Sequence, residues 1–474
     1  MRPISTEAPV FSRRAALQSL ACGFGSVAFQ SLVAQQALAG QPHFAPRIKR
    51  VIFLFMQGGP SHVDTFDHKP VLLKKDGGQI ELQDDRAIAN SGMVQDSQQR
   101  LMGPRWKYAQ HGQSGLWGTD LLPEMCRLMD DFCVINSMHT TGIAHGPATL
   151  FLHCGASNQI RPSMGSWINY GLGSANENLP AFVTICPSAG NGGARNYGSG
   201  FLPAIYQGTP IGKAGPGELD DEPIDHSSNP LRDASRQRLM YELARRQYRL
   251  QMASDPTEQS LCSELESMEL AWRMQRAFPD VMDVSGESEE TLKMYGMDRK
   301  ETSAYGKKCL LARRLAEAGV RYIQVSYGDN SANPAWDQHS NLEHHEKHAR
   351  ATDKPVAGLI RDLKQRGMLE DTLVWWGGEF GRTPYAQNNG TGRDHNAGGF
   401  TVLLAGGGLK KGICHGSTDE LGHKSIENRV HMHDLHATIL HLLGLDHERL
   451  TYRHAGRDFR LTDVHGRVVR EILA

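Results

Sequence analysis

The architecture follows from Arg50-Val51-Ile52-Phe53-Leu54-Phe55-Met56 and from the residues directly after it, Gln57-Gly58-Gly59-Pro60-Ser61-His62-Val63-Asp64-Thr65-Phe66-Asp67. An apolar run of this length indicates a strand buried on both faces, as in a parallel sheet. The polar, glycine-rich segment is typical of a loop at the carboxyl end of such a strand, where open α/β sheets place their active sites.

Similar apolar runs alternate with helical patterns along the rest of the chain. We expect strands over 132–135, 181–186, 321–326, 372–376 and 400–405, and helices over 119–131, 303–318, 341–366 and 434–443. This alternation predicts an α/β fold, a mostly parallel sheet with helices on both faces. Segment 68–118 has no clear periodicity, and we expect it to be an irregular excursion. Residues 40–474 are interpreted as one domain, with a helical insertion or cap at about 228–300.

Residues 1–39 have the pattern of an export signal. Two arginines in Phe11-Ser12-Arg13-Arg14-Ala15-Ala16-Leu17 precede a mild apolar segment, and Ala37-Leu38-Ala39 offers a small-x-small cleavage site. The apolar segment is too broken to span a bilayer, so the pattern favours a twin-arginine signal peptide. We therefore expect a periplasmic or secreted protein that meets the twin-arginine translocase during export. The alternative is an ordinary amphipathic helix at the N-terminus.

Composition narrows the functional classes. A formal net charge of -1 gives no electrostatic reason for binding nucleic acid or a membrane surface, and no later stretch is apolar enough for a stable membrane span. Seven cysteines follow residue 39, an odd number with no Cys-x-x-Cys pair, so a disulfide scaffold and a thiolate zinc site are excluded. One or two bridges stay open for the exported chain, and we expect buried free thiols for most. The chain also lacks P-loop, dinucleotide-binding and Gly-x-Ser-x-Gly motifs.

Polar clusters follow several of the predicted strands. Asp337 and His339 follow the strand at 321–326, Glu379 follows the strand at 372–376, and His395 precedes the strand at 400–405. Carboxylates and imidazoles that converge from several loops favour binding of a divalent metal ion. Imidazole ligands favour Zn, Mn or Fe, whereas ligation by oxygen alone favours Ca. Each motif alone has a structural alternative, such as a stabilised turn or a capped loop.

These motifs together resemble an exported bacterial family, domain of unknown function 1501. The resemblance rests on Gly58-Gly59-Pro60-Ser61-His62-x-Asp64-Thr65-Phe66-Asp67, Trp336-Asp337-x-His339, Glu379-Phe380-Gly381-Arg382-Thr383-Pro384 and Arg393-Asp394-His395. That family looks like a sulfatase-like branch of the alkaline phosphatase superfamily. The resemblance implies an α/β/α sandwich with a metal centre at the strand ends.

The resemblance also implies roles for individual residues. By their order in the chain, Asp337, His339 and His395 suit one metal, while Asp64 and Glu379 suit a second metal or its surroundings. The spacing of Asp337 and His339 departs from the usual Asp-x-x-x-His of the superfamily.

His145-Gly146-Pro147-Ala148-Thr149 stands where sulfatases carry Cys-x-Pro-x-Arg, so the usual Cys or Ser nucleophile is missing. Three interpretations stay open for His145: a nucleophile, a general base or metal ligand, or part of a site that has lost catalysis.

The leading hypothesis is an exported metal-dependent hydrolase of sulfate or phosphate esters, on a small-molecule or polysaccharide substrate. His145 and His62 are candidates for nucleophilic attack or proton transfer, and Arg382 for binding the anionic oxygens. The rival hypothesis is a non-catalytic envelope binding protein that keeps the fold and a metal.

Overall fold

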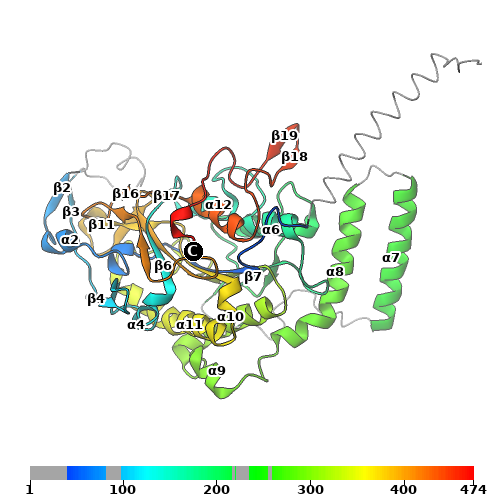
Figure 1. The fold of residues 1–474 in the computed structure, drawn as a ribbon, viewed down its shortest axis with the longest axis horizontal. Helices are drawn as coiled ribbons and strands as arrows, with labels where there is room; N and C mark the ends of the chain where they lie inside the picture. Colours follow the sequence, from blue (N-terminus) through cyan, green and yellow to red (C-terminus); the bar gives the residue numbers. More distant parts are fainter. Residues whose placement is uncertain (1–39, 82–97, 216–218, 220–233, 255–258) are drawn as a thin grey trace, which may run out of the picture.

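The computed structural model describes residues 40–81, 98–215, 219, 234–254 and 259–474. The export signal expected over 1–39 lies outside these residues and stays a prediction. The described part is built around one large sheet with helices on both sides (Figure 1).

The sheet has nine strands in the order β14-β6-β13-β10-β1-β9-β7-β8, with β17 also paired to β6. All neighbouring pairs are parallel except those of β13, which runs antiparallel to β6 and β10. The predicted mostly parallel sheet is thereby confirmed. The strands are β1 (Arg50–Met56), β6 (Phe132–His139), β7 (Phe182–Ile185), β8 (Thr209–Ile211), β9 (Tyr322–Tyr327), β10 (Thr372–Gly377), β13 (Phe400–Gly406), β14 (Ile413–His415) and β17 (Val430–His431).

Strand β1 shows why the sheet is covered on both faces. Successive side chains of a strand point to opposite faces, and all but the first residue of β1 are buried. Ile52, Leu54 and Met56 belong to one hydrophobic cluster, while Val51, Phe53 and Phe55 belong to another. Each face of the sheet therefore needs its own layer of helices.

Two helical layers complete the α/β/α sandwich. One face packs against α4 (Pro123–Cys126), α10 (Lys300–Glu317) and α11 (His345–Gln365). The other packs against α5 (His145–Cys154), α6 (Met164–Leu172) and α12 (Met432–Leu442). Figure 1 shows the sheet between these layers.

Two expectations about secondary structure differ from the fold. The helix expected over 119–131 is reduced to α4 and a 3-10 turn, Met129–Asp131, because the residue before Pro123 cannot easily adopt helical torsions. Segment 68–118 is more ordered than expected: it holds α2 (Pro70–Lys74) and two hairpins, β2 (Gln79–Glu81) with β3 (Gln98–Arg100), and β4 (Tyr108–His111) with β5 (Leu116–Thr119).

Three further helices precede α10 in the chain. Helices α7 (Ala234–Ser254) and α8 (Gln259–Met282) form an antiparallel pair at the edge of the molecule, and α9 (Glu289–Met294) leads on to α10 (Figure 1). The pair lies in the range where we expected an insertion or cap, and that interpretation stays a prediction. Within the described residues, no helix is long and apolar enough to cross a membrane.

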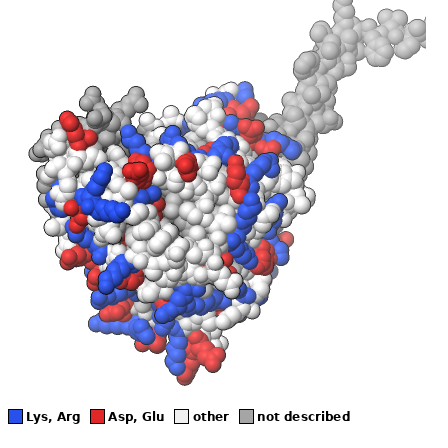
Figure 2. Space-filling view, turned by 60° about the vertical axis from the view of Figure 1, so that its left-hand side comes forward, with Lys and Arg blue, Asp and Glu red and all other residues white. Residues whose placement is uncertain are grey.

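The remaining features concern the surface and the thiols. Acidic and basic side chains are interspersed over the face seen in Figure 2, around a broad uncharged area. Among the described residues, no disulfide involves Cys126, Cys133, Cys154, Cys186, Cys309 or Cys414, and all of these but Cys414 are buried.

Candidate metal centre

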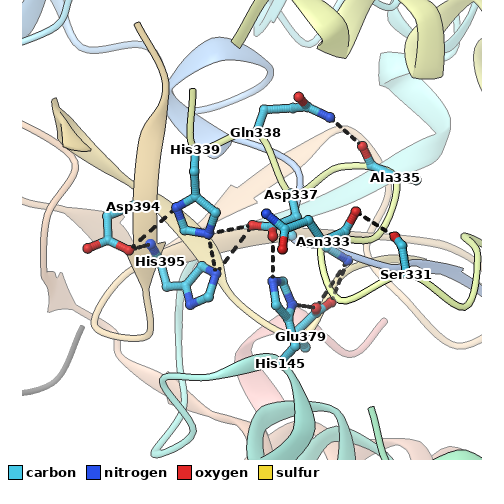
Figure 3. Close-up of polar contacts among 12 residues, drawn as sticks. His145, Ser331, Asn333, Ala335, Asp337, Gln338, His339, Glu379, Asp394 and His395 are labelled. Carbon is cyan, nitrogen blue, oxygen red and sulfur yellow. Dashed lines mark hydrogen bonds and ion pairs between the residues drawn. The ribbon is translucent and has the colours of Figure 1, made fainter. Parts of the chain in front are cut away.

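Four side chains converge beside the carboxyl ends of the central strands. His145 is the first residue of α5, and Asp337 and His339 lie in the loop between β9 and α11. His395 lies on β12 (Arg393–Asn396), which pairs with β11 (Gly381–Ala386) so that Arg382 faces His395. Figure 3 shows these side chains pointing toward one another.

The carboxylate of Asp337 is the centre of this group. Its oxygens lie 3.1 Å from Nε2 of His145, 2.8 Å from Nε2 of His339 and 3.3 Å from Nε2 of His395. The four ligand atoms all lie within 4.8 Å of one another. We call these four residues the His/Asp cluster.

Each imidazole of the cluster is held from behind by an oxygen acceptor. Nδ1 of His145 donates to Oε1 of Glu379 over 2.6 Å, Nδ1 of His395 donates to the carbonyl oxygen of Ile143 over 2.7 Å, and Nδ1 of His339 donates to Oε1 of Gln387. An acceptor at Nδ1 fixes the tautomer that leaves the lone pair of Nε2 free, which is the usual arrangement behind metal-bound histidines.

The geometry in front of the rings fits a cation. Nε2 of His339 and Nε2 of His395 are 3.0 Å apart, although both of these nitrogens carry lone pairs in the tautomers just described. Nε2 of His145 is buried and lies 3.1 Å from Oδ2 of Asp337, in a contact that does not have hydrogen-bond geometry. Lone pairs that face one another are repulsive unless a proton or a metal ion lies between them. Three imidazole nitrogens and one carboxylate favour Zn, Mn or Fe over Ca.

The charges of the cluster depend on protonation. Burial disfavours a charged imidazole at His145, but contacts with Asp337 and Glu379 outweigh it and raise its pKa to about 9. Burial lowers the pKa of His395 to about 3. Burial also works against the charge on Asp337, yet the contacts with the three histidines and with Arg382 hold its pKa well below the usual range. Because a proton and a metal ion compete for Nε2 of His145, metal affinity should rise with pH.

Glycine allows the loop after β1 to lie directly against the cluster. Gly58 has a φ of 106°, and a Cβ atom there would lie 2.6 Å from the backbone nitrogen of Asp337. Its own N–H donates to both carboxylate oxygens of Glu379, at 3.0 and 3.1 Å. A side chain at this position would therefore displace the loop that carries Asp337. The positive φ of Gly58 disfavours any other residue as well.

The structure places the other predicted site residues outside the cluster. Glu379 is fully buried behind His145 and contacts its Nδ1, rather than joining the four ligand atoms. Asp64 is buried against the guanidinium of Arg393, with a 2.7 Å contact, and is not brought to the cluster. His62 is buried, and its Nε2 lies 2.7 Å from the carbonyl oxygen of Gly422.

Contrary to our expectation, Arg382 does not lie where it could bind a substrate's anionic oxygens. It is fully buried, and its guanidinium donates to Oδ1 of Asp337 over 2.6 Å and to the carbonyl oxygens of Gly58, Gly59 and Arg393. As placed, it orients Asp337 and is not directed at a solvent-facing anion.

Two partners of the cluster were missed by the sequence reasoning. Gln387 lies in a 3-10 turn after β11, and the carbonyl of Ile143 carries no side-chain signal. Gln387 is 48 positions from His339, so the hydrogen bond between its amide oxygen and that histidine can be anticipated only if the fold is known.

The chain belongs to the family described as protein of unknown function DUF1501, whose sequence model matches residues 48–473. The family expected from the motifs is thereby confirmed. Comparison with curated proteins finds no match.

Several solved structures are similar to this chain. The lipoteichoic acid synthase LtaP from Listeria monocytogenes has 10% sequence identity and a TM-score of 0.37, covering 88% of this chain and 76% of that chain. The phosphonate monoester hydrolase SpPMH from Silicibacter pomeroyi has 11% identity and a TM-score of 0.33, with 90% and 76% covered. The alkaline phosphatase from the Antarctic bacterium TAB5 has 10% identity and a TM-score of 0.31, with 79% and 96% covered.

Proposed function

We propose that this chain is an exported metal-dependent hydrolase of sulfate or phosphate esters. The observation that supports this most is the His/Asp cluster, in which three Nε2 atoms and the Asp337 carboxylate face one another with every Nδ1 held by an acceptor. A divalent cation held there would supply Lewis acidity, which lowers the pKa of a water molecule and polarises an ester oxygen.

The chain's own residues keep the cluster in position. Glu379 holds the ring of His145, Gln387 holds that of His339, and Arg382 holds the Asp337 carboxylate. The side chains of His145, His339 and His395 are 8%, 10% and 10% exposed, so in this proposal a substrate reaches the cluster where these rings meet the solvent.

His145 acts as a ligand in this proposal rather than as a nucleophile. Its Nδ1 is occupied by Glu379, and its Nε2 is directed into the cluster beside Asp337. This supports the ligand role among the three interpretations that the sequence left open. The substrate is a sulfate or phosphate ester of a small molecule or polysaccharide. The expected export signal would carry the enzyme out of the cytoplasm, where it would meet this substrate.

One observation favours a second candidate function, a non-catalytic envelope protein that retains a metal. Four protein ligands are enough to complete a tetrahedral site, as in structural zinc centres. Among the described residues, no Ser, Thr or Cys side chain hydrogen-bonds to the cluster, so a hydroxyl or thiol nucleophile is not in place there. Such a protein would bind the metal as the hydrolase does, but would not cleave esters.

A panel of aryl sulfates, phosphomonoesters and phosphodiesters tests the proposal. The protein loaded with Zn, Mn or Fe should hydrolyse at least one class, and a chelator should abolish this. The hydrolytic activity of His395→Ala should fall by more than roughly 100-fold, because removing even a residue that only supports a metal ligand costs up to about that much. His344 is an exposed histidine on a 3-10 turn, and His344→Ala should keep full activity. Bound metal without hydrolysis of any ester would support the second candidate, and full activity in His395→Ala would reject the cluster as the site.

A further inference from the structure

Helix α7 carries apolar side chains on two opposite faces. Its inner face meets α8: the ring of Tyr241 stacks on that of Trp272 at an interplanar angle of 2°, and the hydroxyl of Tyr248 donates to Glu264 over 3.0 Å. With 3.6 residues per turn, Leu239, Leu243 and Leu250 lie on the opposite side of the helix.

The outer leucines are unusually exposed. Leu239, Leu243 and Leu250 are 60%, 53% and 66% exposed, and Met240 beside them is 50% exposed. Single exposed apolar side chains are common on protein surfaces, but several on one side of a helix are typical of an interaction site. We call these four residues the α7 apolar row. Arg246 lies between Leu243 and Leu250 on this side. Helix α7 lies at the outer edge of the molecule, so the row faces away from the sandwich (Figure 1).

The charges of α7 indicate what the row contacts. The helix contains five arginines and a single acidic residue, Glu242, although the whole chain has a formal net charge of -1. Arg246 lies next to the leucines on the helical surface, and Arg249 lies one turn further along. The arginines are Arg236, Arg238, Arg245, Arg246 and Arg249.

We propose that the α7 apolar row docks on an anionic lipid surface. Leucines in one row, flanked by arginines and lying along a helix about 32 Å long, fit the boundary between lipid headgroups and acyl chains. The arginines would then meet anionic headgroups. A second copy of this chain is a poorer occupant, because it would bring two sets of arginines together.

Sedimentation with lipid vesicles tests the proposal on the full chain. Wild type should pellet with phosphatidylcholine vesicles that contain phosphatidylglycerol, and added salt should weaken this. Leu239→Ser/Leu243→Ser/Leu250→Ser and Arg246→Glu/Arg249→Glu should each reduce binding by roughly tenfold or more. All variants keep the same N-terminal segment, so differences among them report on α7.

The matched control is Ile160→Ser/Val464→Ser, which removes apolar side chains that are 67% and 71% exposed elsewhere, and which should bind as wild type does. Circular dichroism establishes that each variant keeps its helices. Equal binding by wild type and the leucine variant would overturn the proposal. So would a wild-type dimer that the leucine substitutions dissociate, since the row would then be an interface between two copies.

Discussion

His153 should make the protein sensitive to acid. Its side chain is 2% exposed and lies between the rings of Phe53 and Phe55, with centroid distances of 5.7 and 5.0 Å. Its Nε2 has no hydrogen-bond partner, and burial lowers its pKa to about 3. The folded protein therefore keeps His153 neutral at a pH where the unfolded chain protonates it.

The sign and size of the effect follow from this difference in pKa. Because the folded pKa lies below the unfolded value of about 6.5, the stability is complete above pH 6.5 and is lost as the pH falls toward 3. Lowering the pH from 7.5 to 5 should cost about 2 kcal/mol, from roughly 1.5 pH units at 1.36 kcal/mol each. Burial also lowers the pKa of His436 to about 3, so that histidine adds a loss of the same sign. A loss of about 2 kcal/mol is already a large part of a typical stability of about 5–15 kcal/mol.

Urea unfolding at pH 7.5 and pH 5, with a chelator present so that metal release does not contribute, measures this loss. His153→Leu should lose about 2 kcal/mol less on acidification than wild type. His454→Leu, at an exposed position on β18 (Tyr452–His454), is the control and should behave as wild type. An equal loss of stability in His153→Leu and wild type would refute the reasoning.

Two further predictions concern the contacts of Glu379 and Arg393, and a third concerns the expected cleavage site. Glu379→Gln removes the charged acceptor behind His145 and should weaken metal affinity about 10–100-fold, measured by competition with a chromogenic chelator; unchanged affinity would contradict the role of Glu379. Arg393→Met leaves Asp64 charged and buried without its partner, which should cost about 3–5 kcal/mol in urea unfolding; a loss below about 1 kcal/mol would show that the ion pair is dispensable. N-terminal sequencing of the exported chain should begin at Gly40, and an intact Met1 would argue against cleavage.

Much of the fold could be predicted from the apolar pattern. Apart from their first residues, Arg50 and Thr372, strands β1 and β10 are apolar because both faces of the sheet are covered. Their neighbours in the chain have helical periodicity. The reversed direction of β13 could not be predicted, since direction depends on how the chain returns to the sheet and not on the residues of the strand. The two hairpins in 68–118 could not be predicted either, because short hairpins at the surface have no strong apolar repeat.

The candidate site was predicted in part. Asp337 and His339 follow β9, and the carboxyl ends of parallel strands lie at one edge of the sheet. His395 precedes β13, and it reaches the same edge because β13 runs antiparallel to β10. Their partners could not be assigned in the same way. Asp64 and Glu379 both lie in segments that follow strands, yet Asp64 pairs with Arg393 and Glu379 with His145. Which cation a buried carboxylate meets is decided by tertiary packing, and the sequence contains no local signal for it.

The central claim is that His145, Asp337, His339 and His395 bind one divalent metal ion. Elemental analysis of the purified protein after loading with Zn, Mn or Fe and removal of the excess tests it most directly. We predict one metal ion per chain in wild type, with the same stoichiometry in His344→Ala and none in His339→Ala/His395→Ala. A wild type that retains no metal, or a double variant that retains as much as wild type, would contradict the claim.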